Sequence, residues 1–176
     1  MKNRIQDIFD KSMAIESFTH TSSERNIENF LNHYIGGLPY FQEHSDYFGT
    51  YQIPDDIYQR SVNWALVKGH CADTVILFHH HDTVDIEDFG NLKEFAFDNV
   101  ALKKALASAS LGQDVLDDIA ANNEWQFGRG SCDMKAALAL QLGVVAEYAS
   151  KAEGEVNLLY LSVGDEESYS QGMRAA

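Results

Sequence analysis

The stretch Thr74-Val75-Ile76-Leu77-Phe78 decides the fold, because it joins a run of β-branched and apolar residues to a polar loop, His79-His80-His81-Asp82-Thr83-Val84. The run does not alternate between apolar and polar residues. This pattern is typical of a strand buried on both faces of a parallel sheet. We therefore expect a buried strand whose loop lies at its carboxyl end, where open α/β sheets bind their ligands.

Three further runs of the same character predict the rest of the sheet. They extend from Tyr47 to Ile53, from Val62 to Val67 and from Val156 to Val163, and each is followed within two residues by a proline or a glycine. Because helical segments separate the later strands, we expect an α/β fold that contains parallel strand pairs.

Helical patterns fill the intervals between these strands. Apolar stripes predict two helices before the first strand, the second of them capped at Thr21-Ser22-Ser23-Glu24 and ended by Gly36-Gly37. Asp98-Asn99 caps a third helix, and residues 112–121 form a fourth. Asp133 to Tyr148 is apolar on nearly all sides, which predicts an interior helix opened by Asp133. No repeat or linker divides residues 1–176, so we expect them to lie in one domain.

The composition is that of a globular protein, with 176 residues of which 45% are hydrophobic and 11% aromatic. The formal net charge of −14 repels phosphate groups and anionic lipids. We therefore expect neither nucleic acid nor a membrane surface as a partner. The longest apolar helical stretch, Met134 to Tyr148, is too short to span a bilayer and carries charged residues.

The N-terminal residues and the cysteines indicate a cytoplasmic protein. The chain turns acidic at Asp7 before any apolar segment begins, so we expect no signal peptide. Cys71 and Cys132 are too few to form a disulfide framework, and we expect both to be reduced thiols.

The first segment that carries chemistry is the loop after Phe78. A histidine at a strand end can offer a neutral ring nitrogen to zinc. A carboxylate two residues later lies on the same side of an extended chain and can accept the other ring N–H. Only His80 and Asp82 have this spacing. The alternative is a group of histidines on a surface loop.

The second segment is Gly128-Arg129-Gly130-Ser131-Cys132-Asp133-Met134-Lys135. Its glycines permit a tight loop with close backbone approach. Asp133 has two carboxylate oxygens, enough to bridge two cations about 3.5–4 Å apart. The alternative is an aspartate that only caps the helix.

The third segment, Asp165-Glu166-Glu167, follows the run that ends at Val163. Consecutive carboxylates repel one another unless a cation or solvent lies near, so the segment is either part of a cation site or an acidic solvated turn. Two of the three segments follow predicted parallel strands, and the carboxyl ends of such strands form one edge. Imidazole and carboxylates without a thiol pattern suit a catalytic zinc site, which indicates a metal-assisted hydrolase.

These three segments resemble the signatures of a known family, the co-catalytic zinc hydrolases that include the aminoacylases, carboxypeptidase G and succinyl-diaminopimelate desuccinylase. The family pattern is His-x-Asp-Thr-Val, then Gly-Arg-Gly-x-x-Asp-Met-Lys, then Asp-Glu-Glu, and the chain has all three in that order. The stretches Gly37-Leu38-Pro39-Tyr40-Phe41 and Gly172-Met173-Arg174-Ala175-Ala176 are similar to the arginine-utilisation branch. The resemblance implies a partial three-layer α/β/α sandwich of the zinc exopeptidase type.

The resemblance also implies a role for each residue of the motifs. His80, Asp133 and Glu167 resemble metal ligands, with Asp133 bridging two zinc ions, for which cobalt or manganese could substitute. Asp82 resembles the partner that orients His80, and Glu166 resembles the general base that takes a proton from a metal-bound water. The implied reaction is hydrolysis of an amide bond in a small peptide or an N-acyl amino acid.

The chain departs from the family pattern in two ways. The interval between Asp82 and Asp133 is longer than expected, and we expect its helices to lie near the site entrance. Family members also carry further ligands and a lid and dimerisation domain that have no counterpart here. Residues 1–176 then correspond to the N-terminal part of a catalytic domain, which we expect to be inactive alone. Because the strand from Val156 to Val163 would lack its later neighbours, we expect an exposed apolar edge or face. The chain should then self-associate or have mobile loops near its C-terminus.

Two other interpretations remain open. The chain could be a non-catalytic metal-binding or interaction module built on half of the fold. A metal-dependent phosphoesterase is the other, but Gly128 to Lys135 is not a phosphate-binding loop.

Overall fold

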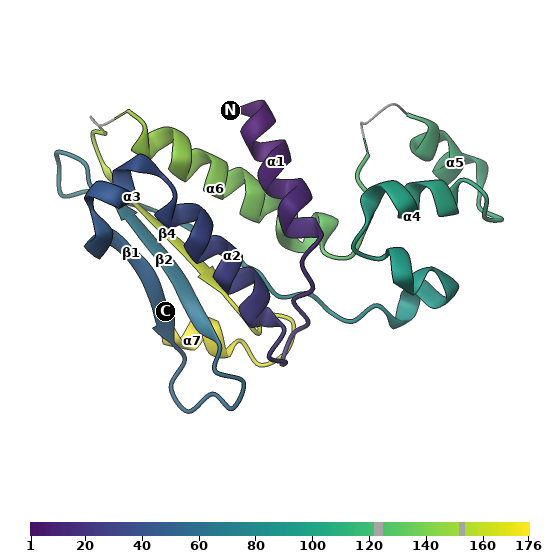
Figure 1. Ribbon diagram of the computed structural model, residues 1–176, viewed down its shortest axis with the longest axis horizontal. Helices are drawn as coiled ribbons and strands as arrows, with labels where there is room; N and C mark the ends of the chain where they lie inside the picture. The colour runs from purple at the N-terminus through teal and green to yellow at the C-terminus, as the bar shows by residue number, and fades with distance from the viewer. Residues whose placement is uncertain (122–124, 152–153) are drawn as a thin grey trace.

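A four-stranded sheet forms the centre of the protein in the computed structural model, which describes residues 1–121, 125–151 and 154–176 (Figure 1). The strands are β1 (Phe48–Gln52), β2 (Ser61–Val67), β3 (Thr74–His80) and β4 (Asn157–Val163), in the order β1-β2-β4-β3. β3 and β4 run parallel, whereas the β1–β2 and β2–β4 pairs are antiparallel. All four predicted strands and the parallel pair are therefore confirmed, and the carboxyl ends of β3 and β4 lie side by side.

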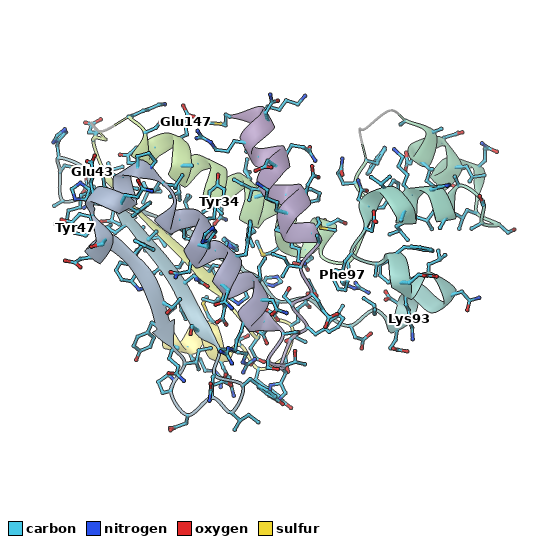
Figure 2. All side chains as sticks on the ribbon, in the orientation of Figure 1. Tyr34, Glu43, Tyr47, Lys93, Phe97 and Glu147 are labelled. Carbon is cyan, nitrogen blue, oxygen red and sulfur yellow. The ribbon has the colours of Figure 1, made fainter. Side chains whose placement is uncertain are left out.

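One face of the sheet carries the main hydrophobic core (Figure 1). It is covered by α1 (Lys2–Met13), α2 (Glu24–Gly36), the short α3 (Pro39–Glu43) and α6 (Ala136–Ala149). Alternate residues of the strands, such as Ala65, Leu158 and Tyr160, face these helices and are fully or almost fully buried. Tyr34, labelled in Figure 2, packs against the same core from α2.

The other face of the sheet has a thinner cover. Ile53, Val62 and Val163 form a small second core there, against which Ala175 of α7 (Gln171–Ala175) packs. In the part of the chain that the structure describes, α7 is the only helix on this face. The architecture is thus the partial three-layer α/β/α arrangement that we expect. One helical layer and the sheet are complete, and the short α7 alone represents the other helical layer in the described residues.

The prediction that β3 is buried on both faces is wrong for its first half. β3 forms the edge of the sheet, and its side chains Val75 and Ile76 are 48% and 57% exposed. Only the end of the strand, at His79 and His80, is buried. A continuous apolar run shows that a strand can be covered, but it does not show that a neighbouring element covers it. The expectation that the fourth strand lacks neighbours is wrong, because β4 lies between β2 and β3 and the exposed edge is β3. Self-association of the chain remains a prediction.

The helix that follows the glycine loop begins later than its pattern predicts. α6 starts at Ala136, and Asp133 lies before it in a short turn, η3 (Ser131–Lys135), with an extended backbone and a cis peptide bond to Met134. The reason is the preceding Gly130, whose left-handed conformation turns the chain back before the helix can begin. Asp133 is therefore not the helix cap, and its carboxylate is free of that role.

Residues 85–121 form an arm beside the core, at the right of Figure 1. It contains η2 (Glu87–Phe95), α4 (Asn99–Leu106) and α5 (Gln113–Ala120), close to the predicted bounds. Asp98 caps α4 as expected, since its carboxylate accepts hydrogen bonds from the amides of Val100 and Ala101. Phe97, labelled in Figure 2, lies where the arm meets the core, and its ring packs against that of Phe18.

Two smaller expectations also have an outcome. α2 begins at Glu24 as predicted, but the Ser23 hydroxyl accepts a hydrogen bond from the Phe18 amide and does not cap the helix. Cys71 and Cys132 are free and exposed, as expected. The remaining element is a single 3-10 turn, η1 (Ser45–Tyr47). Among residues 1–121, 125–151 and 154–176, no helix is long and apolar enough to cross a membrane.

Candidate metal centre

His80 ends β3 and presents both ring nitrogens to acidic groups. Its side chain is 5% exposed. Nδ1 lies 3.1 Å from the backbone carbonyl oxygen of Asp82 and 3.3 Å from its carboxylate Oδ1. On the other side of the ring, Nε2 lies 2.9 Å from Asp133 Oδ1. A proton on Nδ1 that is donated to Asp82 fixes the tautomer, so Nε2 is the nitrogen that a metal ion would take.

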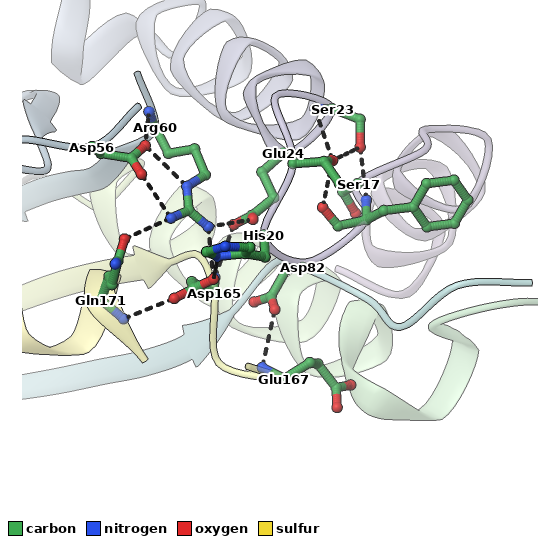
Figure 3. A network of polar contacts seen from close by, with 12 residues as sticks. Ser17, His20, Ser23, Glu24, Asp56, Arg60, Asp82, Asp165, Glu167 and Gln171 are labelled. Carbon is green, nitrogen blue, oxygen red and sulfur yellow. Dashed lines mark hydrogen bonds and ion pairs between the residues drawn. The ribbon is translucent and has the colours of Figure 1, made fainter. Parts of the chain in front are cut away.

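Asp82 is fully buried and connects the two parallel strand ends (Figure 3). Its carboxylate accepts hydrogen bonds from the backbone amides of Glu166, at 3.0 Å, and Glu167, at 3.1 Å. Burial alone would raise the pKa of Asp82, but its hydrogen bonds with His80 and the two amides lower it to about 2. Asp82 is therefore ionised at neutral pH, which is the form that accepts the His80 ring N–H.

The glycine loop brings Asp133 to the same place. Gly130 has a φ of 77°, and a Cβ there would lie only 2.7 Å from Thr83 Cγ2. A residue with a side chain would push this loop away from the one that follows β3. The Asp133 side chain is 73% exposed, so its second oxygen faces solvent.

Together, the three motifs form one cluster of ligand atoms. A nitrogen of His80 and carboxylate oxygens of Asp133 and Glu167 all lie within 4.8 Å of one another. Glu166 lies beside them, with its Oε2 3.8 Å from His80 Nε2 and its side chain 51% exposed. The structure thus brings together all five residues that the sequence identifies: His80, Asp82, Asp133, Glu166 and Glu167.

This cluster has the properties of a cation site. Its donors are an imidazole and carboxylates, the set that catalytic zinc sites use, and one atom of each residue lies within 4.8 Å of the others. Burial, together with the charges of Asp133, Asp82 and Glu166, raises the pKa of Glu167 despite the opposing effect of His80. Among the described residues, no lysine or arginine forms an ion pair with Asp133, Glu166 or Glu167. The donor set therefore fits a metal ion.

The acidic neighbours of His80 favour the protonated form of its ring. Burial lowers the pKa of His80, but Asp82, Asp133 and Glu166 together outweigh this effect and raise the pKa to about 9. A proton on Nε2 occupies the lone pair that a cation needs.

Sequence reasoning missed a second set of polar residues behind this cluster. Arg60 and Glu24 are fully buried, and both contact Asp165, the first residue of the acidic segment. Asp165 is itself fully buried, so it points away from Glu166 and Glu167. Arg60 stands in no motif, and Glu24 stands only in a helix-capping pattern. Both are far from Asp165 in sequence, so no local pattern could have indicated this network.

The match to a known family covers the second and third motifs. Residues 113–176 match the family described as Peptidase family M20/M25/M40. This part of the chain is therefore similar to the M20 peptidase family. The sequence resemblance to co-catalytic zinc hydrolases is confirmed at this level. The first motif, which contains His80, lies outside the matched residues.

A curated relative matches nearly the whole length of the chain. The chain is 36% identical over 176 residues to Protein RocB of Bacillus subtilis, an alignment that covers 98% of the chain and 31% of RocB. The chain therefore spans about a third of the length of this curated relative.

Solved structures show the same fold. A tripeptidase from Staphylococcus aureus superposes with a TM-score of 0.62 at 14% identity, over 100% of this chain and 40% of that protein. An M20 family metallo-carboxypeptidase from Sulfolobus solfataricus has a TM-score of 0.61 at 17% identity, over 93% and 31%. At these identities the likeness concerns the fold alone, and it confirms the exopeptidase type of α/β sheet.

Proposed function

We propose that this chain carries part of the active site of a metal-dependent M20 hydrolase that cleaves the amide bond of a small peptide or an N-acyl amino acid. The observation that carries the proposal is the meeting of His80, Asp133 and Glu167, which come from three distant segments and lie within 4.8 Å of one another. An acidic cluster of this kind, with no lysine or arginine paired to it in the described residues, is suited to bind cations.

Each residue of the cluster has a proposed task. His80, Asp133 and Glu167 would hold two zinc ions, or cobalt or manganese in their place. Asp82 orients His80. Bound metal ions would lower the pKa of water and polarise the amide carbonyl. Glu166, which is half-exposed and is not among the ligand atoms, accepts a proton from water and passes it to the leaving amine.

The extent of the chain defines how much of the enzyme it represents. We assign residues 1–176 to the N-terminal part of a catalytic domain, since the chain spans 31% of the length of RocB. Further ligands and the substrate-binding groups then come from the remaining two thirds of a full-length protein. The arginine-utilisation branch of the family is part of this proposal, supported by the 36% identity to RocB. The net charge of −14 supports small-molecule substrates over nucleic acids.

Calorimetric titration of zinc into the purified metal-free chain tests the site. We expect binding in the wild type and its loss in His80→Ala and in Asp133→Ala, because each variant removes a ligand. His33→Ala and Asp46→Ala are matched controls, since both residues are exposed and lie outside the cluster. Binding that persists in both ligand variants, or is lost equally in the controls, would contradict the assignment.

Hydrolysis requires a separate measurement on a full-length protein that contains this chain. We expect release of free amino acid from N-acyl amino acids or dipeptides with zinc, and none from the Glu166→Gln variant. A full-length protein that binds zinc at His80 and Asp133 but hydrolyses neither class of compound would instead indicate a non-catalytic metal-binding module.

A further inference from the structure

Arg60, at the start of β2, is the centre of a closed polar network behind the candidate metal centre (Figure 3). Its side chain is fully buried. Nη1 donates to Glu24 Oε1 at 2.7 Å and to Asp165 Oδ1 at 2.8 Å. Nη2 donates to Asp56 Oδ1 at 2.8 Å and to Gln171 Oε1 at 2.7 Å, and Nε donates to Asp56 Oδ2 at 3.0 Å. One guanidinium thus joins four segments of the chain.

Two of these segments are the beginning and the end of the turn that carries Glu166 and Glu167. Asp165 begins the turn with a φ of 65°, a conformation that residues other than glycine rarely adopt. Glu24 Oε2 accepts a hydrogen bond from the Asp165 amide at 2.8 Å. At the other end, the amide of Ser170 donates to the Asp165 carbonyl at 2.6 Å, and the amide of Gln171 donates to Asp165 Oδ2 at 3.2 Å.

Gly164 lets the Glu24 carboxylate come close to the backbone of the turn. A Cβ at Gly164 would clash with the Glu24 carboxylate, so only glycine lets Glu24 reach the turn backbone. The turn is therefore held from behind by Arg60 and Glu24, and from the front by Asp82, which accepts the amides of Glu166 and Glu167.

We propose that Arg60 is a positioning residue, which sets where the turn from Asp165 to Gln171 places the carboxylates of Glu166 and Glu167 relative to His80. This proposal rests on the proposed function, because the positions of Glu166 and Glu167 matter for activity only if they act at a metal site. The restraint that Arg60 places on the turn does not depend on a metal ion. A guanidinium suits this task because its planar fork bonds several carboxylates in fixed directions, whereas the ammonium of lysine is a single point charge.

The competing explanation is that Arg60 only stabilises the fold. Removing one partner of a buried ion cluster leaves the other charges unpaired, which destabilises the whole protein. The two explanations differ in which backbone amides lose protection from exchange when Arg60 is replaced. If Arg60 only stabilises the fold, its removal affects every protected amide alike. If Arg60 positions the turn, the amides of Glu166 and Glu167 respond first, because they lie on the segment that Arg60 restrains.

Amide hydrogen exchange by NMR, in the metal-free chain, separates these explanations. The variants are Arg60→Met and the milder Arg60→Lys, which remains informative if the first does not fold. We expect exchange at Glu166 and Glu167 to accelerate about tenfold or more in Arg60→Met and less in Arg60→Lys, and more than in Val145→Ala. The amides of β4 are expected to accelerate only as far as the free energy of unfolding falls. Val145→Ala, which shortens a buried side chain of α6, is the control for general destabilisation.

Zinc titration of the same variants gives the second readout. We expect the dissociation constant to rise about tenfold in Arg60→Met, with part of the affinity restored in Arg60→Lys and no such change in Val145→Ala. Asp56→Asn, which changes the Arg60 partner farthest from the turn, is expected to leave exchange at Glu166 and Glu167 close to the wild-type rate.

The outcomes of the two experiments are distinguishable. Unchanged exchange at Glu166 and Glu167 in a folded Arg60 variant, or the uniform increase that Val145→Ala produces, overturns the positioning role. Failure of the wild type to bind zinc contradicts the proposed metal site in this chain, but the exchange rates still decide whether Arg60 positions the turn.

Discussion

Two acidic clusters lie on either side of the turn that follows β4, and they differ in how their charge is balanced. In the buried cluster, Glu24, Asp56 and Asp165 surround Arg60, and all of them are almost completely excluded from solvent. In the open cluster, Asp133 and Glu166 are 73% and 51% exposed, and no lysine or arginine of the described residues pairs with them. The first cluster surrounds a guanidinium, whereas the basic partner of the second is the imidazole of His80.

This difference distinguishes carboxylates that stabilise the fold from carboxylates that are available to bind a ligand, in a chain with a net charge of −14. Carboxylates that are buried without a counter-charge destabilise a fold, so Arg60 is needed where solvent cannot reach. Carboxylates that gather at an accessible strand end without a counter-charge remain ready to bind a cation from solution. Asp165 and Glu167 are two residues apart, yet the turn directs one to each cluster.

The largest expected effect is on stability, and it tests the comparison directly. Arg60→Met is expected to lower the free energy of unfolding by about 3–5 kcal/mol, because it leaves buried carboxylates unpaired. Glu167→Ala in the metal-free chain is expected to change it by less than about 0.5 kcal/mol, or to raise it slightly, since neighbouring carboxylates disfavour the charge of Glu167. Urea denaturation of both variants measures the difference, and equal effects would mean that the two clusters do not differ in kind.

The second prediction concerns pH and the buried Glu28, beside the Arg60 cluster. Glu28 is 5% exposed, and burial raises its pKa from 4.5 to about 7. The folded protein therefore holds the proton more tightly than the unfolded chain, so this contribution to stability is complete below about pH 4.5 and is lost as the pH rises to about 7. Its upper limit is about 3 kcal/mol.

Glu28→Gln removes this titration and keeps an acceptor for the Ser61 amide. We expect the variant to gain stability relative to the wild type between pH 5 and about pH 8, as measured by urea denaturation at each pH. A constant difference across this range would show that Glu28 is ionised in the folded protein throughout, and that Arg60 and its neighbours supply the counter-charge it needs.

The sequence predicts the open cluster better than the buried one, and the reason is physical. His80 and Asp82 are two residues apart at a strand end, so local geometry brings them together. Asp133 and Glu167 follow segments whose glycines and strand patterns indicate where they end. Arg60 meets Glu24 across 36 residues and Asp165 across 105, and only the complete tertiary structure decides such partners.

The limits of the fold prediction have the same origin. The strand pattern of β3 is correct, but the exposure of Val75 and Ile76 depends on which element lies beside the strand. The apolar pattern of α6 extends back to Asp133, but the left-handed Gly130 and the extended backbone that follows delay the helix to Ala136. Local preference predicts elements well, whereas the neighbours of an element and its first turn depend on the surrounding structure.

A third, smaller effect is expected at Asp82, which contacts both the His80 ring and the turn that follows β4. Asp82→Asn keeps the size of the side chain but weakens both its bond to the His80 ring and its acceptance of the turn amides. We expect zinc affinity to fall by about 10- to 100-fold, because a partner that orients a ligand histidine contributes about this much. Calorimetry with Asp85→Asn, an exposed aspartate three residues away, as the control measures the effect; equal affinities in the two variants would remove Asp82 from the site.

The smallest effect is expected for Glu166, and it distinguishes a proton acceptor from a ligand within the open cluster. Glu166→Gln is expected to change zinc affinity by no more than about twofold, because His80, Asp133 and Glu167 supply the clustered ligand atoms. Glu167→Gln, the matched change one residue later, replaces a ligand carboxylate by a neutral amide and is expected to weaken binding strongly. If the two variants lose affinity equally, Glu166 is itself a ligand. Another group must then accept the proton from water, and the general base would lie outside the five residues that the sequence identifies.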